Sequence, residues 1–319
     1  MVLDKTKKLV GLSPMEGVTD SVFRQVLCRI GRPDIFLTEF LNVDGYCSKG
    51  KKHVVHRISF TEEEKPLIIQ LWGNTPEYYE KTIDGIMQDG LKPDGIDINM
   101  GCSVKDVLSG GRGSALINNP GLAKEIIESA KIGCAKYNLP LSVKTRIGYD
   151  QIDTENWIGF LLEQHLDMIT VHGRTSKQTY TTPANWEEIG KCIPLRDKIS
   201  PTTLILGNGD LKSKKEGDSY VKKYNLDGYL IGRQVMNNPW VFAGRESADV
   251  SKQEKIQTFL LHLDLYEKTF VDRKPFAFEK KYVKAYLSDF EGVNELRREI
   301  LLTEDIASMR EILYRELDN

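Results

Sequence analysis

The clearest structural pattern in the chain lies in residues 65–99, KPLIIQLWGNTPEYYEKTIDGIMQDGLKPDGIDIN. Residues 65–72 contain the continuous apolar run Leu67-Ile68-Ile69, residues 76–87 are expected to form a helix, and residues 95–99 form a second short strand. Continuous apolar runs are typical of parallel strands that are buried on both faces. These residues therefore predict one strand–helix–strand unit with two parallel strands.

The same alternation repeats along most of the chain. Apolar strand candidates lie at residues 10–15, 35–40, 65–72, 95–99, 141–144, 168–172, 203–206 and 228–231, with helical segments between them. The best delimited helix is Pro120–Tyr137, because Asn119 and Pro120 suit its N-cap and first helical position. Strict alternation favours a parallel α/β fold, and eight such units predict a closed (β/α)8 TIM barrel.

A helical segment follows the last strand. From residue 250 onward the chain shows helical periodicity and no strand-like run. Apolar residues at helical spacing mark four helices, near Ile256–Leu263, Tyr282–Phe290, Leu296–Leu301 and Ile306–Leu313. We therefore predict two domains, a (β/α)8 barrel over residues 1–245 and a small C-terminal helical bundle over residues 246–319.

The composition narrows the class of protein. Of 319 residues, 40% are hydrophobic and 28% are charged, and the net charge is −2. No stretch approaches the roughly 20 apolar residues of a membrane helix, and the lysine-rich residues 1–8 are not followed by a signal-peptide pattern. We expect a cytoplasmic monomer without membrane contact.

The cysteines and the charge limit the kinds of site. Five scattered cysteines without a C-x-x-C pair predict no metal site and no disulfide. Because the net charge is slightly negative, any nucleic-acid contact needs a local basic patch.

Polar and glycine residues follow nearly every predicted strand. They are Pro14-Met15-Glu16-Gly17, Gln70, Asn99-Met100-Gly101-Cys102, Lys144-Thr145-Arg146, His172-Gly173-Arg174, Gly207-Asn208-Gly209-Asp210 and Gly232-Arg233. Each of these alone is typical of an ordinary loop. Active sites of (β/α)8 enzymes lie at the carboxyl ends of the strands, so the whole set favours a binding site there.

Glycines after the seventh and eighth strands indicate a phosphate group. Gly209 and Gly232 let backbone N–H groups approach a ligand closely, and these two loops are the usual phosphate-binding place of the fold. Arg233 can add a charge-assisted contact. Lys144 and His172 would then lie deeper on the rim, near the ring of a phosphorylated cofactor.

Six motifs, in order, resemble those of the tRNA-dihydrouridine synthase family. They are Leu12-Ser-Pro-Met-Glu-Gly-Val-Thr-Asp20, Ile98-Asn-Met-Gly-Cys102, Val143-Lys-Thr-Arg-Ile-Gly148, Thr170-Val-His-Gly-Arg-Thr175, Gly207-Asn-Gly-Asp210 and Asp227-Gly-Tyr-Leu-Ile-Gly-Arg233. The resemblance covers nearly the whole chain, including the helical tail at residues 282–290 and 295–300. Two positions depart from the family pattern: Glu16 stands in place of the usual Ala, and Ser103 in place of the common Pro, a change that bears on how Cys102 is presented.

The resemblance implies a bound flavin mononucleotide, FMN. The implied contacts are Pro14 and Met15 near the isoalloxazine, Gln70, Lys144 and His172 at its polar edge, and Asn208, Gly209, Gly232 and Arg233 at the phosphate. NADPH is the expected transient reductant. No G-x-G-x-x-G motif follows a strand, so no separate nicotinamide domain is predicted.

The resemblance also implies the reaction, which is reduction of the C5=C6 bond of specific uridines in tRNA to 5,6-dihydrouridine. Asn99 and Arg174 are expected to hold the uracil, and Cys102 is expected to be the catalytic acid. The hypothesis is that a hydride passes from FMN N5 to C6 and a proton from Cys102 to C5. A thiol with a pKa of about 8.5 is mostly protonated at neutral pH. A nucleophilic role for Cys102 is the rival chemical interpretation.

The implied partner is tRNA, whose target base must be flipped out of its stack. The helical tail is the candidate RNA-binding surface. Its basic residues are Arg273, Lys274, Lys280, Lys281, Lys284, Arg297 and Arg298, with Tyr282 and Tyr286 interleaved. Charged helix faces are often only solvated surface, so the resemblance is the main support for this prediction.

Other functions stay open at this point. The first is an FMN barrel oxidoreductase of a free small molecule, of the dihydroorotate or dihydropyrimidine dehydrogenase type, which the helical tail and residues 99–102 argue against. The second is an inactive barrel that helps tRNA to fold, which Cys102, Lys144 and His172 argue against. A pyridoxal-phosphate or sugar-phosphate barrel is a third and weaker alternative.

Overall fold

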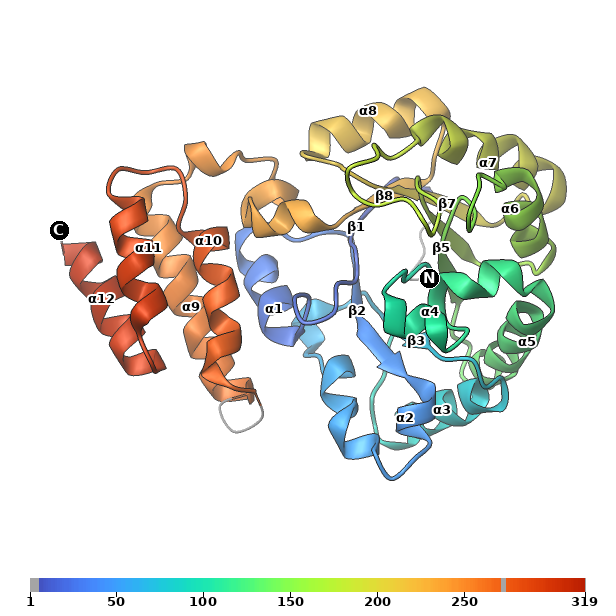
Figure 1. The fold of residues 1–319 in the computed structure, drawn as a ribbon, viewed down its shortest axis with the longest axis horizontal. Coiled ribbons are helices and arrows are strands. Elements are labelled where there is room, and N and C mark those ends of the chain that lie inside the picture. The colour runs from blue at the N-terminus through green and yellow to red at the C-terminus, as the bar shows by residue number, and fades with distance from the viewer. Residues whose placement is uncertain (1–5, 271–273, 319) are drawn as a thin grey trace. The chain divides into compact units, whose positions relative to one another are not determined.

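Eight parallel strands form the centre of the protein in the computed structural model, which describes residues 6–270 and 274–318. They are β1 (Leu9–Leu12), β2 (Ile35–Asn42), β3 (Leu67–Trp72), β4 (Gly95–Met100), β5 (Leu141–Arg146), β6 (Met168–His172), β7 (Leu204–Asn208) and β8 (Gly228–Ile231). Each strand pairs with its neighbour in sequence, and β8 closes on β1, with Leu12 opposite Ile231. The predicted (β/α)8 TIM barrel is confirmed (Figure 1).

The barrel interior is apolar toward the amino ends of the strands and polar toward their carboxyl ends. The apolar part is a cluster of Leu9, Ile35, Leu37, Ile68, Met168, Leu204, Leu206 and Leu230. Side chains alternate between the two faces of a strand. Gln70 therefore shares the inward face of Ile68, and Asn208 that of Leu206. Inward-facing polar side chains thus collect where active sites of this fold form.

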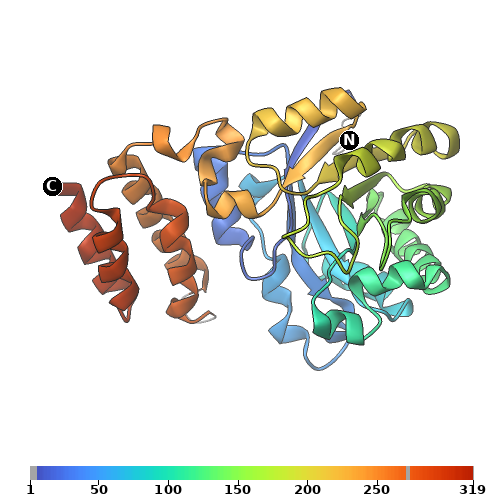
Figure 2. The same cartoon turned by 45° about the horizontal axis from the view of Figure 1, so that its top comes forward.

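Helices surround the strands on the outside of the barrel, as both views show (Figures 1 and 2). They are α3 (Glu77–Gln88), α5 (Pro120–Lys136), α6 (Thr154–Glu163), α7 (Trp186–Ile199) and α8 (Lys214–Tyr224), with the short helix α2 (Val43–Tyr46). The short helix α4 (Lys105–Ser109) lies in the connection that follows β4. The connection from β2 to β3 contains α2 and three 3-10 turns in place of a long helix. Burial of the outward face of the strands is therefore shared by long and short elements.

Two helices show where local sequence signals hold and where they do not. α5 begins as predicted, because the Asn119 side chain accepts a hydrogen bond from the Leu122 N–H at 3.2 Å and Pro120 follows it. A proline inside a sequence usually marks the end of a helix, but α7 continues to Ile199 with Pro194 inside it. Ile193 is buried against the barrel, and this packing outweighs the backbone hydrogen bond that a proline removes.

The chain divides into two compact units. The barrel unit runs to residue 21 and contains residues 34–211 and 216–232; the helical unit contains residues 22–33, 212–215 and those from 233 onward. Most of α1 (Ser21–Ile30) thus groups with the C-terminal helices. The domain boundary between residues 245 and 246 stays a prediction.

Four helices form most of the C-terminal part of the helical unit. They are α9 (Lys252–Phe270), α10 (Val283–Tyr286), α11 (Val293–Leu302) and α12 (Ile306–Asp318), and the 3-10 helix Phe276–Tyr282 precedes α10. In the parts of the chain that the structure describes, no helix is long and apolar enough to span a bilayer. Arg273 and residues 1–5, which belong to predicted basic segments, lie outside the described residues.

The core of the helical unit contains aromatic residues that the sequence suggested for RNA contact. Tyr282 and Tyr286 are fully buried. The Tyr286 ring stacks on Phe259 with centroids 5.3 Å apart, and its hydroxyl lies 2.9 Å from His262 Nδ1. His262 Nε2 in turn lies 2.7 Å from the Glu279 carboxylate. The two tyrosines are therefore not available to stack on bases, because their spacing places them on the apolar face of the helix.

Candidate active site

Side chains from five neighbouring strands meet at the carboxyl end of the barrel. The strand register places Asn99 opposite Lys144, and His172 opposite Asn208. Gln70 lies on β3, and its side chain accepts a hydrogen bond from Asn99. The structure thus brings together these five predicted site residues on one rim.

A chain of hydrogen bonds runs from the barrel interior to the loop after β4. The buried Asp97 carboxylate accepts from Gln70 Nε2 at 2.6 Å, and Gln70 Oε1 accepts from Asn99 Nδ2 at 2.9 Å. Asn99 Oδ1 accepts from the backbone N–H groups of Gly101 and Cys102 at 3.1 and 2.9 Å. A carboxylate can only accept. Asp97 therefore fixes which way both amide side chains point.

Cys102 lies in residues 99–104, which we call the cysteine loop, and it is partly exposed. Its carbonyl accepts hydrogen bonds from the backbone N–H and the hydroxyl of Ser114, both at 2.9 Å. Burial raises the pKa of the Cys102 thiol, while a hydrogen bond from the Val104 N–H and two nearby cations oppose this rise. The thiol is therefore protonated at neutral pH, as a proton donor must be.

Arg146 belongs to the polar residues predicted at the end of the fifth strand, but the sequence predicts no role for it. Its Nε donates to the Gly101 carbonyl at 2.6 Å, and its Nη1 donates to the Thr175 carbonyl at 2.9 Å. Burial lowers the pKa of Arg146 to about 10, and the charge of Arg174 adds to this effect. Arg146 still carries its charge at neutral pH, so it places a fixed cation next to Cys102.

Lys144 connects the middle of the rim to β7. Its Nζ donates to Asn208 Oδ1 at 3.1 Å, and Asn208 Nδ2 donates to the Leu230 carbonyl at 2.9 Å. Burial lowers the pKa of Lys144 to about 8; the charge of Arg146 acts in the same direction, and the carboxylate of Asp97 opposes it. Lys144 is therefore a cation at neutral pH that loses its charge in mild alkali.

His172 and Arg174 form a third group on the rim. The Arg174 side chain is only 2% exposed, and it pairs with Asp210 and donates from Nε to the Thr182 carbonyl at 2.6 Å. Arg174 Nη1 lies 3.2 Å from His172 Nε2. Since a guanidinium only donates, Nε2 is the acceptor and the neutral ring carries its proton on Nδ1. The contact of Arg174 with uracil stays a prediction.

Asn208, Gly209 and Gly232 form what we call the glycine rim. Gly209 has φ +133°, and a Cβ placed there would lie 2.6 Å from Ala184 Cβ. At Gly232 the nearest atom to a Cβ is Ser13 Cβ at 3.5 Å, an ordinary contact. The chain itself thus requires glycine at position 209, whereas glycine at position 232 leaves room that the protein does not need.

Pro14 and Met15 lie in the loop after β1, and both are partly exposed. A turn holds this loop, because the Met15 N–H donates to Thr19 Oγ1 at 2.9 Å. Arg233 follows Gly232 directly and is the first residue of the last segment of the helical unit. The cofactor contacts of these three residues stay predictions.

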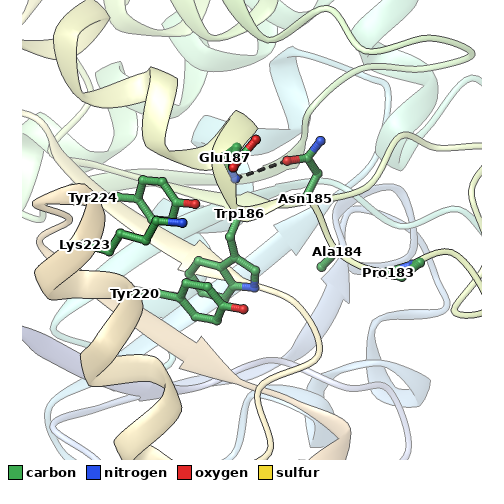
Figure 3. A pocket seen from close by; sticks show the side chains of 8 residues that line it. All are labelled: Pro183, Ala184, Asn185, Trp186, Glu187, Tyr220, Lys223 and Tyr224. Carbon is green, nitrogen blue, oxygen red and sulfur yellow. Dashed lines mark hydrogen bonds between the residues drawn. The ribbon is translucent and has the colours of Figure 1, made fainter.

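A separate hollow of about 380 Å³ lies beside α7 and α8 on the outside of the barrel (Figure 3). Its lining residues are Pro183, Ala184, Asn185, Trp186, Glu187, Tyr220, Lys223 and Tyr224. The rings of Trp186 and Tyr220 stack with centroids 4.3 Å apart, as Figure 3 shows. Trp186 Nε1 donates to the Gly209 carbonyl at 3.1 Å, so the wall of this hollow contacts the glycine rim.

Three residues that support the site have no predicted role: Asp97, Arg146 and Ser114. Asp97 lies two positions before Asn99, and Arg146 two positions after Lys144, so the period of two along a strand is a signal that identifies both. Ser114 has no such signal, because its contact depends on how the loop after β4 folds back to Cys102.

Within residues 6–270 and 274–318, no three His, Cys, Asp or Glu side chains are grouped to hold a metal ion.

Comparisons with known proteins cover nearly the whole chain. The profile of the family described as dihydrouridine synthase matches residues 11–316. A probable tRNA-dihydrouridine synthase 2 of Bacillus subtilis is 39% identical over 305 residues, which cover 95% of this chain and 92% of that protein. A probable tRNA-dihydrouridine synthase of Staphylococcus epidermidis is 40% identical over 305 residues, or 95% and 91% of the two chains.

Solved structures with a similar arrangement are more distant in sequence. An old yellow enzyme homologue of Zymomonas mobilis has a TM-score of 0.47 at 11% identity, over 73% of this chain and 86% of that chain. Morphinone reductase has a TM-score of 0.48 at 10% identity, over 74% and 84% of the two chains. The family profile and the sequence relatives carry the assignment: this chain belongs to the dihydrouridine synthase family.

Proposed function

We propose that this protein reduces the C5=C6 bond of specific uridines in tRNA to 5,6-dihydrouridine, with bound FMN and with NADPH as the reductant. The observation that carries the proposal is the position of Cys102 just after β4, in a loop that Asn99 and Ser114 hold and that the Arg146 guanidinium contacts at Gly101. The printed names of the relatives in Bacillus subtilis and Staphylococcus epidermidis support tRNA as the substrate. We further propose that the enzyme is a cytoplasmic monomer.

The rim residues fit a cofactor that combines a planar ring with a phosphate. Gly232 leaves room where a Cβ would stand, and backbone N–H groups at such glycines can approach a phosphate. Gln70 uses one of its two amide hydrogens toward Asp97, so the other can serve the polar edge of the ring. Lys144 supplies a positive charge. The proposed FMN site consists of Pro14, Met15, Gln70, Lys144, His172, Asn208, Gly209, Gly232 and Arg233.

The residues of the rim divide the chemistry among them. When bound and reduced, FMN supplies the hydride for C6 of the uracil. Cys102 donates the proton to C5, and the positive charges of Arg146 and Lys144 stabilise the thiolate that remains. Asn99 and Arg174 are proposed to hold the uracil.

Of the described basic tail residues that the sequence suggested for RNA contact, two are exposed. Lys280 Nζ and Arg297 Nε donate to backbone carbonyls of the helical unit at 2.9 and 2.6 Å, so part of their hydrogen-bonding capacity is already used. Lys284 and Arg298 are exposed to solvent. We propose that these two contact phosphates of the tRNA, because such contacts position an RNA without reading its sequence.

The test is an absorption experiment on the purified protein under anaerobic conditions. A flavin spectrum that NADPH bleaches and unmodified tRNA restores, with dihydrouridine then found in the tRNA by mass spectrometry, is the expected result. Restoration by free uridine and not by tRNA would instead favour a small-molecule reductase. Failure to bind FMN even after reconstitution would contradict the proposed cofactor site.

A further inference from the structure

The guanidinium of Arg146 contacts the residues on both sides of Cys102. Nε donates to the Gly101 carbonyl at 2.6 Å, and Nη2 donates to the Ser103 hydroxyl at 3.1 Å. Nη1 donates to the Thr175 carbonyl, in the loop after β6, at 2.9 Å. Each of the three guanidinium nitrogens thus has a partner, in the planar geometry that arginine provides.

Only one of these three hydrogen bonds is accepted by a side chain; the other two are accepted by backbone carbonyls. The carbonyls of Gly101 and Thr175 are present whatever the residue type, whereas the hydroxyl exists because serine occupies position 103. The backbone of Cys102 is held separately, by Asn99 at its N–H and by Ser114 at its carbonyl. The Ser103 hydroxyl therefore sets the tilt of the guanidinium and not the position of the Cys102 backbone.

We propose that Ser103 is a positioning residue for the acid Cys102: its hydroxyl fixes the Nη2 edge of Arg146, so that positive charge already lies where the thiolate forms. The assignment of Cys102 as an acid rests on the proposed function. In that step the S–H bond breaks, a C–H bond forms at C5 of the base, and the electron pair of the S–H bond stays on the sulfur. A charge fixed beforehand stabilises this thiolate without reorganisation.

The electrostatics of the thiol agree with this arrangement. Burial raises the pKa of Cys102, and the charge of Arg146 is one of the influences that lower it. A guanidinium that loses its Ser103 partner can tilt away from the sulfur and lower the pKa less. Removal of the hydroxyl should therefore make the thiolate of Cys102 harder to form.

The experiment compares three variants of the full-length protein with FMN bound. Ser103→Ala removes the hydroxyl and Ser103→Thr keeps it. Ser109→Ala is the matched control, since the Ser109 hydroxyl donates to the Asp106 carbonyl within α4 at 3.1 Å. For each, the rate of Cys102 alkylation by iodoacetamide is followed against pH by peptide mass spectrometry, and kcat and KM are measured with unmodified tRNA.

We expect Ser103→Ala to slow alkylation of Cys102 near neutral pH by about three- to tenfold, the effect of one hydrogen bond. Its kcat should fall by a similar factor with KM unchanged, and Ser103→Thr and Ser109→Ala should match the unaltered protein. An alkylation profile of Ser103→Ala that coincides with that of the unaltered protein, or an equal effect of Ser109→Ala, would overturn the positioning role. A shifted alkylation profile in a protein that does not reduce tRNA would support this role and refute the proposed function.

Discussion

The cysteine loop and the glycine rim lie at the same end of the barrel and are built in different ways. In the cysteine loop, backbone groups next to Cys102 bond to protein partners: Asn99 accepts two N–H groups, and Ser114 donates to the carbonyl. On the glycine rim, a Cβ at Gly232 would have Ser13 as its nearest neighbour, at 3.5 Å. The loop is thus fixed by the chain alone, while position 232 of the rim leaves room for a group from outside.

The difference follows from what each region has to do. A proton donor must sit at a set distance from its acceptor, which requires a loop whose geometry is fixed before the substrate arrives. A phosphate site needs backbone N–H groups that a ligand can approach. Substitutions in the cysteine loop should therefore change turnover and not flavin binding, and substitutions at Gly232 should do the reverse.

The largest effect that separates the two regions is expected from Cys102→Ala. The thiol is the proposed acid and contributes no contact to the glycine rim, so FMN content should stay unchanged. Loss of a general acid should lower kcat by at least about 100-fold. Stopped-flow absorption measures this as slow reoxidation of the reduced flavin by tRNA.

Cys47→Ala is the control for Cys102→Ala. Cys47 is also partly exposed, but it lies between β2 and β3, with its Sγ 3.8 Å from the Tyr78 carbonyl. This variant should keep normal turnover. Loss of FMN from Cys102→Ala would show that the cysteine loop and the glycine rim do not act separately.

The next effect in size distinguishes the two glycines of the rim. Gly209→Ala places a Cβ 2.6 Å from Ala184 at φ +133°, so the free energy of unfolding in urea should fall by about 1–3 kcal/mol. Gly232→Ala meets only an ordinary contact, so the free energy of unfolding should change by less than about 0.5 kcal/mol. The added methyl group should instead weaken FMN binding by about tenfold, or about 1.4 kcal/mol.

Fluorescence titration of the apoprotein with FMN measures this affinity. The alkylation rate of Cys102 in Gly232→Ala should equal that of the unaltered protein. This measurement tests whether a change on the glycine rim leaves the cysteine loop unaffected. Normal FMN affinity in Gly232→Ala would mean that the phosphate does not bind at the glycine rim.

The sequence predicts the barrel and much of the rim, because both depend on local patterns. Eight apolar runs give the strands, and Lys144, His172 and Asn208 can be placed because each lies at or near the end of such a run. The side-chain hydrogen bonds between strands cannot be predicted from such local patterns. Those from Gln70 to Asp97 and from Asn99 to Gln70 span 27 and 29 residues, and they depend on the register of the closed barrel.

The helical unit shows a second limit of local patterns. Tyr282 and Tyr286 lie among lysines at a spacing of four residues, a pattern that suits either a surface that stacks on bases or an apolar face. Both side chains are fully buried. Packing against α9 decides between the two interpretations, and this packing cannot be inferred from the segment alone.

A smaller effect on FMN binding is expected from Trp186→Phe. Trp186 lines the outer hollow and contacts the glycine rim. The substitution removes the hydrogen bond from Nε1 to the Gly209 carbonyl and keeps an aromatic ring against Tyr220. Loss of one such bond should weaken FMN binding by about fivefold, or about 1 kcal/mol. Tyr220→Phe keeps the stack and the bond to Gly209, so it should bind FMN normally. Equal affinities of the two variants would show that Trp186 does not support the glycine rim.

The smallest effect is a shift in the pH dependence of kcat, and it concerns the positive charge of Lys144, which lies between the cysteine loop and the glycine rim. Lys144 has a pKa lowered to about 8, and the Asp97 carboxylate is one of the groups that keep it from falling further. If activity requires the Lys144 cation, kcat should decline as the pH rises through about 8. Asp97→Asn removes the negative charge, so the pKa of Lys144 should fall and the decline should begin at lower pH, by less than about one pH unit.

Lys144→Arg is the control for this alkaline decline. Arginine keeps its charge at this pH, so the decline near pH 8 should disappear even if the overall rate is lower. Asp97→Asn keeps one side-chain oxygen that can accept from Gln70 Nε2, so this contact can remain while the negative charge is removed. An alkaline decline that stays in place in both variants would show that a group other than Lys144 titrates.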